Sequence, residues 1–98
     1  MKKVYRNWGF YRNILVLPFL KIKYLSFKGE LSYQKHFFRT EIWFKLSGGG
    51  LFILNCKRFK NLKIFYIKKR NWHQFKGKAT FIEIQFGKKV IETDILRK

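Results

Sequence analysis

The stretch ATFIEIQF, residues 79–86, carries the clearest structural signal in the sequence, because its side chains alternate in character with a period of two. The alternate positions on one side hold Ile82, Ile84 and Phe86, and those on the other hold Phe81, Glu83 and Gln85. Successive side chains of a strand point to opposite faces of a sheet, so this alternation predicts a β-strand. We therefore expect a sheet that includes residues 79–86.

A second strand is predicted over residues 14–25, ILVLPFLKIKYL. In its second half Leu20, Ile22 and Tyr24 alternate with Lys21 and Lys23. This pattern predicts that the apolar side faces the core and that the lysines face outward. Pro18 lacks a backbone N–H, so it favours a sheet edge or a bulge in the first half.

The remaining segments suggest further short elements joined by turns. Residues 26–30 read as a turn, a short strand is expected about Tyr33, and residues 34–46 fit either a helical turn or a short strand. The glycines at 48–50 are expected to break the chain, and the apolar run 51–56 predicts a fully buried strand. Residues 62–70 fit a strand or a strained helix, residues 87–89 a turn, and 90–98 a further short element.

These segments predict an α+β fold dominated by β-structure, with a small mixed or antiparallel sheet and little helix. A chain of 98 residues is long enough for one small domain. We expect a basic, aromatic N-terminal arm over residues 1–13 and a single domain over 14–98. Within that domain, residues 14–86 would form the sheet core and 87–98 a C-terminal extension.

Charge dominates the composition. Lysine and arginine total 23 against five acids, which gives a formal net charge of +18. Such an excess repels itself in a compact chain unless a polyanion neutralises it, and nucleic acid is the first candidate. The aromatic residues among the basic ones suit stacking on unpaired RNA bases.

The residues that carry catalytic or metal chemistry are few and scattered. His36, His73 and Cys56 match no zinc-ligand spacing, and the acid pair Glu92 and Asp94 has no catalytic partner nearby in the sequence. The sequence therefore predicts neither an enzyme nor a metal, cofactor or small-molecule substrate. A lone cysteine favours a reducing compartment, and the longest apolar run is too short for a transmembrane helix.

Three stretches resemble protein 8 of the small ribosomal subunit, in its C-terminal domain. LKIKYLSFKGELSY holds Ser26, Gly29 and Tyr33 in the family's register, and EIWFKLSGGGLFIL and FKGKATFIEI follow in the family's order. The resemblance covers about residues 20–86. A shorter stretch, FKGKATFIEIQFGKKVI, is similar to protein 19 of the same subunit.

The resemblance implies a structural constituent of the small ribosomal subunit, with ribosomal RNA and neighbouring ribosomal proteins as partners. The preference for lysine, isoleucine and phenylalanine follows A/T-rich codons, which favours an organelle-encoded protein of the mitochondrial matrix, working in translation. The expected RNA contacts form a central cluster, a second cluster, a family-derived cluster and an arm: Asn55, Lys57, Arg58 and Lys60; Lys68, Lys69, Arg70 and Trp72; Ser26, Lys28 and Gly29; and Lys2, Lys3, Arg6 and Trp8.

Two alternatives remain at this point. The glycines Gly48 to Gly50 could bring bare backbone close to RNA, or could serve an ordinary hairpin turn. The chain could also be a basic accessory subunit of an organellar inner-membrane complex, although no stretch shows the amphipathic helical period that lipid binding favours.

Overall fold

The computed structural model describes residues 2–60, 62–88, 90–91 and 93–97. Within these residues it contains nine β-strands and no helix, so no helix that could cross a membrane is present there. The strands are β1 (Lys3–Arg6), β2 (Gly9–Leu17), β3 (Leu20–Glu30), β4 (Gln34–Lys35), β5 (Arg39–Leu54), β6 (Lys57–Lys60), β7 (Ile64–Ile67), β8 (His73–Gly87) and β9 (Leu96–Arg97). The β-dominated fold is confirmed, whereas the α+β class is wrong.

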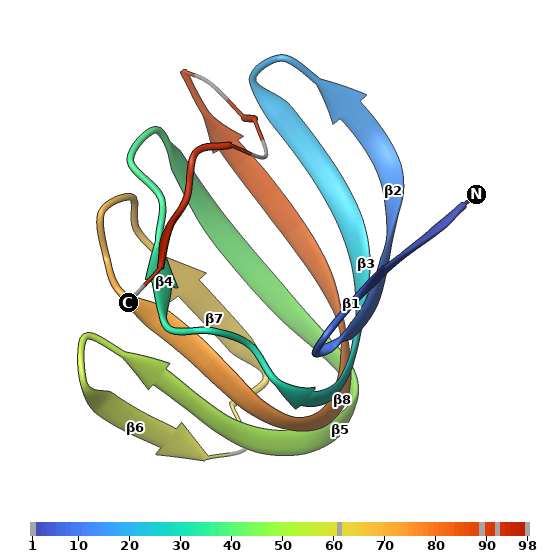
Figure 1. Cartoon of the computed structure of the whole chain (residues 1–98), viewed down its shortest axis with the longest axis vertical. Coiled ribbons are helices and arrows are strands. Elements are labelled where there is room, and N and C mark those ends of the chain that lie inside the picture. The colour runs from blue at the N-terminus through green and yellow to red at the C-terminus, as the bar shows by residue number, and fades with distance from the viewer. Residues whose placement is uncertain (1, 61, 89, 92, 98) are drawn as a thin grey trace.

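All strand pairs are antiparallel, and β8 is the centre of the sheet. It pairs with β3 along one edge and with β5 along the other, while β1 and β2 extend the β3 side. The outer edge of β5 pairs first with β7 and then with β6. Figure 1 shows that the long strands curve, so the sheet curls into an open half-barrel with a concave inner side.

Two short strands lie apart from the long ones. β4 joins β8 through the single pair Gln34 and His73, and it pairs with β9 along its other edge. The chain between β3 and β4 is fixed by a hydrogen bond from the Leu31 N–H to the Phe75 carbonyl. These contacts place the segment that carries Gln34 and His36 beside the start of β8.

The concave side is divided into an apolar part and a polar part. In the apolar part, the rings of Phe52 and Phe65 stack with centroids 4.1 Å apart, and Phe27 and Phe81 pack edge to face at 5.7 Å. Each buried ring removes a large apolar area from water, so this cluster is the main source of stability. The polar part lies further along the same strands and holds buried charged residues instead.

The long alternating strand is present, and its mixed face points inward. Phe81, Glu83 and Gln85 are all buried, whereas Phe86 on the opposite face is exposed. On β3 the predicted orientation is wrong, because Lys21 and Lys23 are the buried residues. The lysines face inward because the register sets Lys23 opposite Glu83, so the inner face is polar here and offers partners for the charges.

The glycine run also differs from the prediction of a chain break. Gly48 to Gly50 lie inside β5, just after a register shift between Lys45 and Ser47. Gly48 has a φ of 84°, and a Cβ on it would lie 2.2 Å from the Lys78 carbonyl oxygen. The glycines therefore let β5 curve closely against β8, and the turn comes later, at Asn55 and Cys56.

Other predicted elements are shifted or changed. Residues 34–46 form β4 and the first half of β5, and residues 51–54 end β5 with only Phe52 fully buried. Residues 62–70 contain the short strand β7. Residues 3–6 and 9–12, expected in the N-terminal arm, form the β1–β2 hairpin at one edge of the sheet, and β9 lies in the expected C-terminal extension.

Candidate active site

A pocket of about 470 Å³ opens on the concave side of the half-barrel. Its volume lies in the range of small-molecule sites. It is lined by acids, cations, amides and aromatic rings that come from both ends of the sequence, among them Arg6, Trp8, Tyr11, Lys23, Gln34, Arg39, Glu41, Trp43, Glu83, Gln85 and Arg97. An inner surface so rich in charge suits a polar, charged ligand.

Two buried carboxyl groups line this pocket. Glu41 on β5 is 1% exposed and Glu83 on β8 is 4% exposed, and each carboxyl shifts the pKa of the other. Two neighbouring buried carboxyl groups do not both ionise easily, so one of them keeps a proton. The Gln85 amide donates to Glu83, and the Trp43 indole N–H donates to Oε1 of Glu41 at 3.1 Å.

The surroundings decide which carboxyl keeps the proton. Burial, as the largest cause, and the neighbouring Glu41 together raise the pKa of Glu83 to about 8, although Lys23 opposes both effects. Burial alone would also raise the pKa of Glu41, but Arg39 and the two histidines outweigh it and hold this pKa below its usual range. At neutral pH Glu83 is therefore the acid of the pair and Glu41 the carboxylate.

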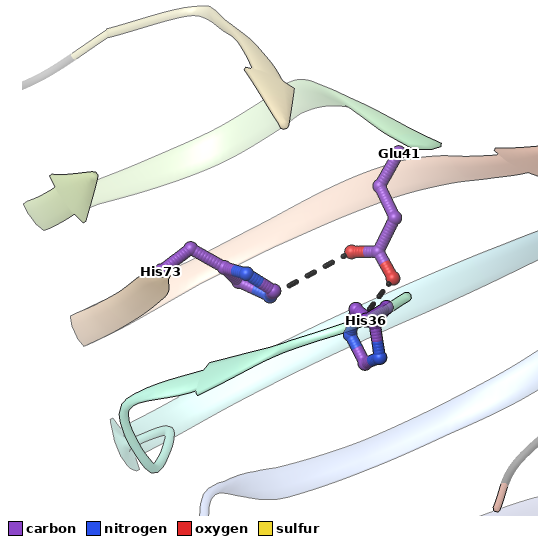
Figure 2. Close-up of side chains that lie close together, drawn as sticks. All are labelled: His36, Glu41 and His73. Carbon is purple, nitrogen blue, oxygen red and sulfur yellow. Dashed lines mark ion pairs between the residues drawn. The ribbon is translucent and has the colours of Figure 1, made fainter. Parts of the chain in front are cut away.

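Both histidines approach Glu41, as Figure 2 shows. His36 Nε2 lies 3.2 Å from Glu41 Oε2, and His73 Nε2 lies 3.8 Å from Oε1. His36 Nδ1 lies 2.6 Å from the Asp94 carbonyl oxygen and donates to it, which leaves Nε2 with a lone pair. Burial lowers the pKa of both rings, that of His73 to about 4, so both are neutral at physiological pH.

His36, Glu41 and His73 have the composition of a two-histidine, one-carboxylate metal site, and their ligand atoms lie within 4.8 Å of one another. However, Arg39 already donates to two of these three groups. Its Nε lies 2.9 Å from Glu41 Oε2, and its Nη2 lies 3.1 Å from His36 Nε2. The residues present therefore do not fit a divalent cation in this arrangement.

The residues predicted to contact RNA lie mainly elsewhere. The central and second clusters are in contact, because the Trp72 N–H donates to the side-chain oxygen of Asn55 at 2.9 Å. The family-derived cluster contacts the arm, because the Lys28 N–H donates to the Trp8 carbonyl at 2.7 Å. Lys57, Arg58, Lys60, Lys68, Lys69 and Arg70 are exposed. Of the predicted residues, only Arg6 and Trp8 line the pocket.

Sequence reasoning missed the residues at the centre of the pocket. Glu83 and Gln85 occupy alternate positions in β8, so the sequence indicates that they share one face of their strand. Lys23 alternates with Lys21 in β3 in the same way, and β3 pairs with β8. The pairing of these strands was the missing information. Cys56, which had been considered together with the histidines, is exposed and lies 3.5 Å from the Tyr33 hydroxyl.

Comparisons with known proteins agree with a barrel of this type. The family model described as "Mannose-6-phosphate isomerase C-terminal" matches residues 1–98, and a search of curated proteins found no match. Among solved structures, a Streptomyces Pac13 variant with uridine is 13% identical with a TM-score of 0.86, covering 99% of this chain and 83% of that chain. A protein from Planctomyces limnophilus is 17% identical with a TM-score of 0.85, covering 97% and 88%.

A third similar structure is oxalate decarboxylase from Bacillus subtilis, 12% identical with a TM-score of 0.77, covering 98% of this chain and 29% of that chain. Pac13 is described as a nucleoside dehydratase. At these identities the likeness establishes the fold, which is that of a cupin-type barrel.

The ribosomal resemblance is wrong, because the isomerase family model covers the whole chain and the similar structures are cupin-type barrels. Short strand-and-glycine motifs recur in many antiparallel sheets, so they matched ribosomal proteins by pattern alone. The role that followed from them is also wrong: a structural constituent of the small ribosomal subunit with ribosomal RNA and ribosomal proteins as partners. The expected location in the mitochondrion stays a prediction.

The exclusion of an enzyme and of a small-molecule substrate is wrong as well. Barrels of the same fold include a dehydratase and a decarboxylase, and the pocket here supplies acid–base residues in a confined space. The chain belongs to the family of the mannose-6-phosphate isomerase C-terminal domain.

Proposed function

We propose that this chain catalyses a proton-transfer isomerisation of a phosphorylated sugar in the pocket of its half-barrel. The observation that carries the proposal is the buried pair of Glu83 and Glu41 beside Lys23 and Arg39 in a pocket of about 470 Å³. The family description, a mannose-6-phosphate isomerase domain, names a reaction of this class.

Glu83 is suited to carry the proton. A catalytic acid or base works best when its pKa lies near the working pH, and the pKa of Glu83 is about 8. In its ionised form, Glu83 would remove a proton from the carbon next to the sugar carbonyl. The electron pair of that C–H bond would move toward the carbonyl oxygen and form an enediolate. Return of the same proton to the former carbonyl carbon, with exchange of the hydroxyl proton between the two oxygens, completes the isomerisation without a co-reactant.

Cations in the same pocket would stabilise the charge that develops on the oxygen. Lys23 lies directly opposite Glu83 in the β3–β8 ladder, and both residues line the pocket. A fixed positive charge beside a developing oxyanion lowers the barrier most effectively where water is largely excluded. Glu41 would act as a positioning residue, because its charge keeps the pKa of Glu83 high.

Two further cations suit the phosphate. Arg6 comes from β1 and Arg97 from β9, and both line the pocket although they lie at opposite ends of the sequence. Arginine binds phosphate oxygens in a bidentate way, which fixes orientation as well as affinity. The phosphate would therefore bind at these arginines and the carbonyl end of the sugar near Glu83.

The test is isomerisation of mannose 6-phosphate by the purified protein, followed by NMR of the sugar in D₂O. We expect product formation in the wild type and a loss of about 100-fold or more in kcat/KM for Glu83→Gln. The control is Lys57→Gln, because Lys57 is exposed on β6 and lies outside the set of residues that line the pocket. No turnover by the folded wild type, or equal rates in both variants, would contradict the proposal.

A further inference from the structure

The cluster of His36, Glu41 and His73 contains three groups that commonly bind a transition metal together. His36 Nε2 and Glu41 Oε2 lie 3.2 Å apart, and both carry lone pairs. Two acceptors this close repel each other unless a positive group lies against both. In metalloproteins that group is a cation such as Zn²⁺ or Fe²⁺.

In this chain the positive group is the Arg39 side chain. Its Nε donates to Glu41 Oε2 at 2.9 Å and its Nη2 donates to His36 Nε2 at 3.1 Å, so one guanidinium bridges both acceptors. Its Nη1 donates to the Ile91 carbonyl at 3.2 Å. All three nitrogens are therefore engaged, and Arg39 is only 6% exposed.

We infer that the guanidinium of Arg39 replaces a divalent cation in this cluster, so that the pocket works with a built-in organic cation and takes up no metal. The inference deepens the proposed function, on which its catalytic meaning rests. The positive charge that orients Glu41 beside Glu83 then comes from a side chain, present at every concentration of free metal.

Charge balance supports this exclusion. Glu41 contributes one negative charge and Arg39 one positive charge, whereas His36 and His73 are neutral in this environment. A divalent ion bound here would lie within a few ångströms of a guanidinium that cannot lose its proton. To bind it, Arg39 would have to leave, which would deprive Glu41, His36 and Ile91 of a buried donor.

One ligand atom remains available. His73 Nε2 is buried and has no hydrogen-bond partner among the residues that the structure describes, and it lies 3.8 Å from Glu41 Oε1. A single imidazole is too few ligands for a tight structural or catalytic site. If Arg39 is removed, however, His36, Glu41 and His73 all become available, so loss of the guanidinium should create a metal site.

The experiment measures binding of Co²⁺ and Zn²⁺ to chelator-treated protein without a tag, by visible absorption and by calorimetry. All variants carry Cys56→Ser, because the exposed thiol could bind these metals. We expect no stoichiometric uptake in the Arg39 parent, about one equivalent in Arg39→Ala, and loss of that uptake in Arg39→Ala/His73→Ala. Arg39→Gln gives a second variant with better packing.

The outcomes separate clearly. Uptake of one equivalent by the Arg39 parent that disappears in His73→Ala would overturn the inference, and so would a folded Arg39→Ala or Arg39→Gln that gains no metal. If neither Arg39 variant folds, binding to the parent decides alone. Metal binding is read without any substrate, so failure of the isomerase assay leaves this result intact, and a metal-binding parent would leave the proton-transfer proposal standing.

Discussion

Glu83 on β8 and Glu41 on β5 are buried beside the same pocket, and their opposite pKa shifts leave one proton between them at neutral pH. Two neighbouring carboxylates cannot both ionise easily in a buried site, so the pair titrates as a unit. Lys23 and Arg39 limit the cost of the remaining negative charge. This pair makes the stability of the protein depend on pH in a way that can be measured.

Replacing Glu83 by glutamine should remove the loss of stability toward alkaline pH. The folded-state pKa of Glu83 is about 8, above its ordinary value of 4.5, so the folded protein retains a proton that the unfolded chain has lost. The free energy of unfolding therefore falls as the pH rises through this window. Urea denaturation at about pH 7 and pH 9, above the range in which the histidines titrate, should show a decrease of about 1–2 kcal/mol in the wild type. Glu83→Gln should show little change, and retention of the wild-type slope would refute the shared proton.

His73→Gln should act on the acid side. The folded-state pKa of His73 is about 4, below its ordinary value of 6.5, so the unfolded chain binds a proton that the folded protein does not. Stability should therefore fall as the pH drops from about 6.5 toward 4, and the variant should lose part of this slope. The effect of Glu41, whose pKa is lowered, lies below pH 4.5 and remains in the variant. Thermal melts across this range check the prediction, with Glu83→Gln as the control that keeps the acid slope.

Asp94 anchors the end of the chain to the segment that carries His36. Its two carboxylate oxygens accept the N–H groups of Phe37 and Phe38 at 2.8 and 2.9 Å, and its carbonyl accepts from His36. In Asp94→Asn one acceptor becomes an NH₂ group that faces a donor. We expect a loss of about 1–3 kcal/mol in the free energy of unfolding. Hydrogen exchange should also show faster exchange at the Phe37 and Phe38 amides, and unchanged protection there would contradict this role.

Gly48→Ala should be far more harmful than Gly49→Ala. Gly48 has a φ of 84°, and an added Cβ would lie 2.2 Å from the Lys78 carbonyl oxygen. Gly49 has no positive φ, although it is the next residue in the same strand. We expect Gly48→Ala to cost more than about 2 kcal/mol or to prevent folding, whereas Gly49→Ala should be close to neutral. Comparison of their denaturation midpoints checks this, and equal midpoints would show that the close β5–β8 contact is not required.

The strand over residues 79–86 was predictable because alternation with a period of two is a local property of the sequence. The orientation of β3 was not predictable, because the prediction assumed that the core is apolar along the whole strand. Lys21 and Lys23 point inward only because β8 sets Gln85 and Glu83 opposite them. A buried lysine requires a partner, and strand pairing, which brings that partner, is not visible in one sequence.

The candidate site could not be predicted for the same reason. Arg39 and Glu41 are close in the sequence, but Lys23, His73 and Glu83 come from distant positions and meet only when the sheet curls. The sequence therefore contains no short motif with the spacing of a catalytic site. The large positive charge led the interpretation toward RNA, although it describes the outer surface of the molecule more than its pocket.

The same charge predicts how stability depends on salt. A net charge of +18 on a small domain opposes the compact state, and added salt screens this repulsion. The thermal midpoint should therefore rise between about 0.05 and 0.5 M NaCl. Lys57 and Lys60 on β6 are exposed, so Lys57→Glu/Lys60→Glu should raise the midpoint at low salt and weaken the salt dependence. Lys57→Gln/Lys60→Gln serves as the matched control and should give an intermediate effect. A midpoint that falls with salt, or that is insensitive to both double variants, would show that the surface charges are not the main source of repulsion.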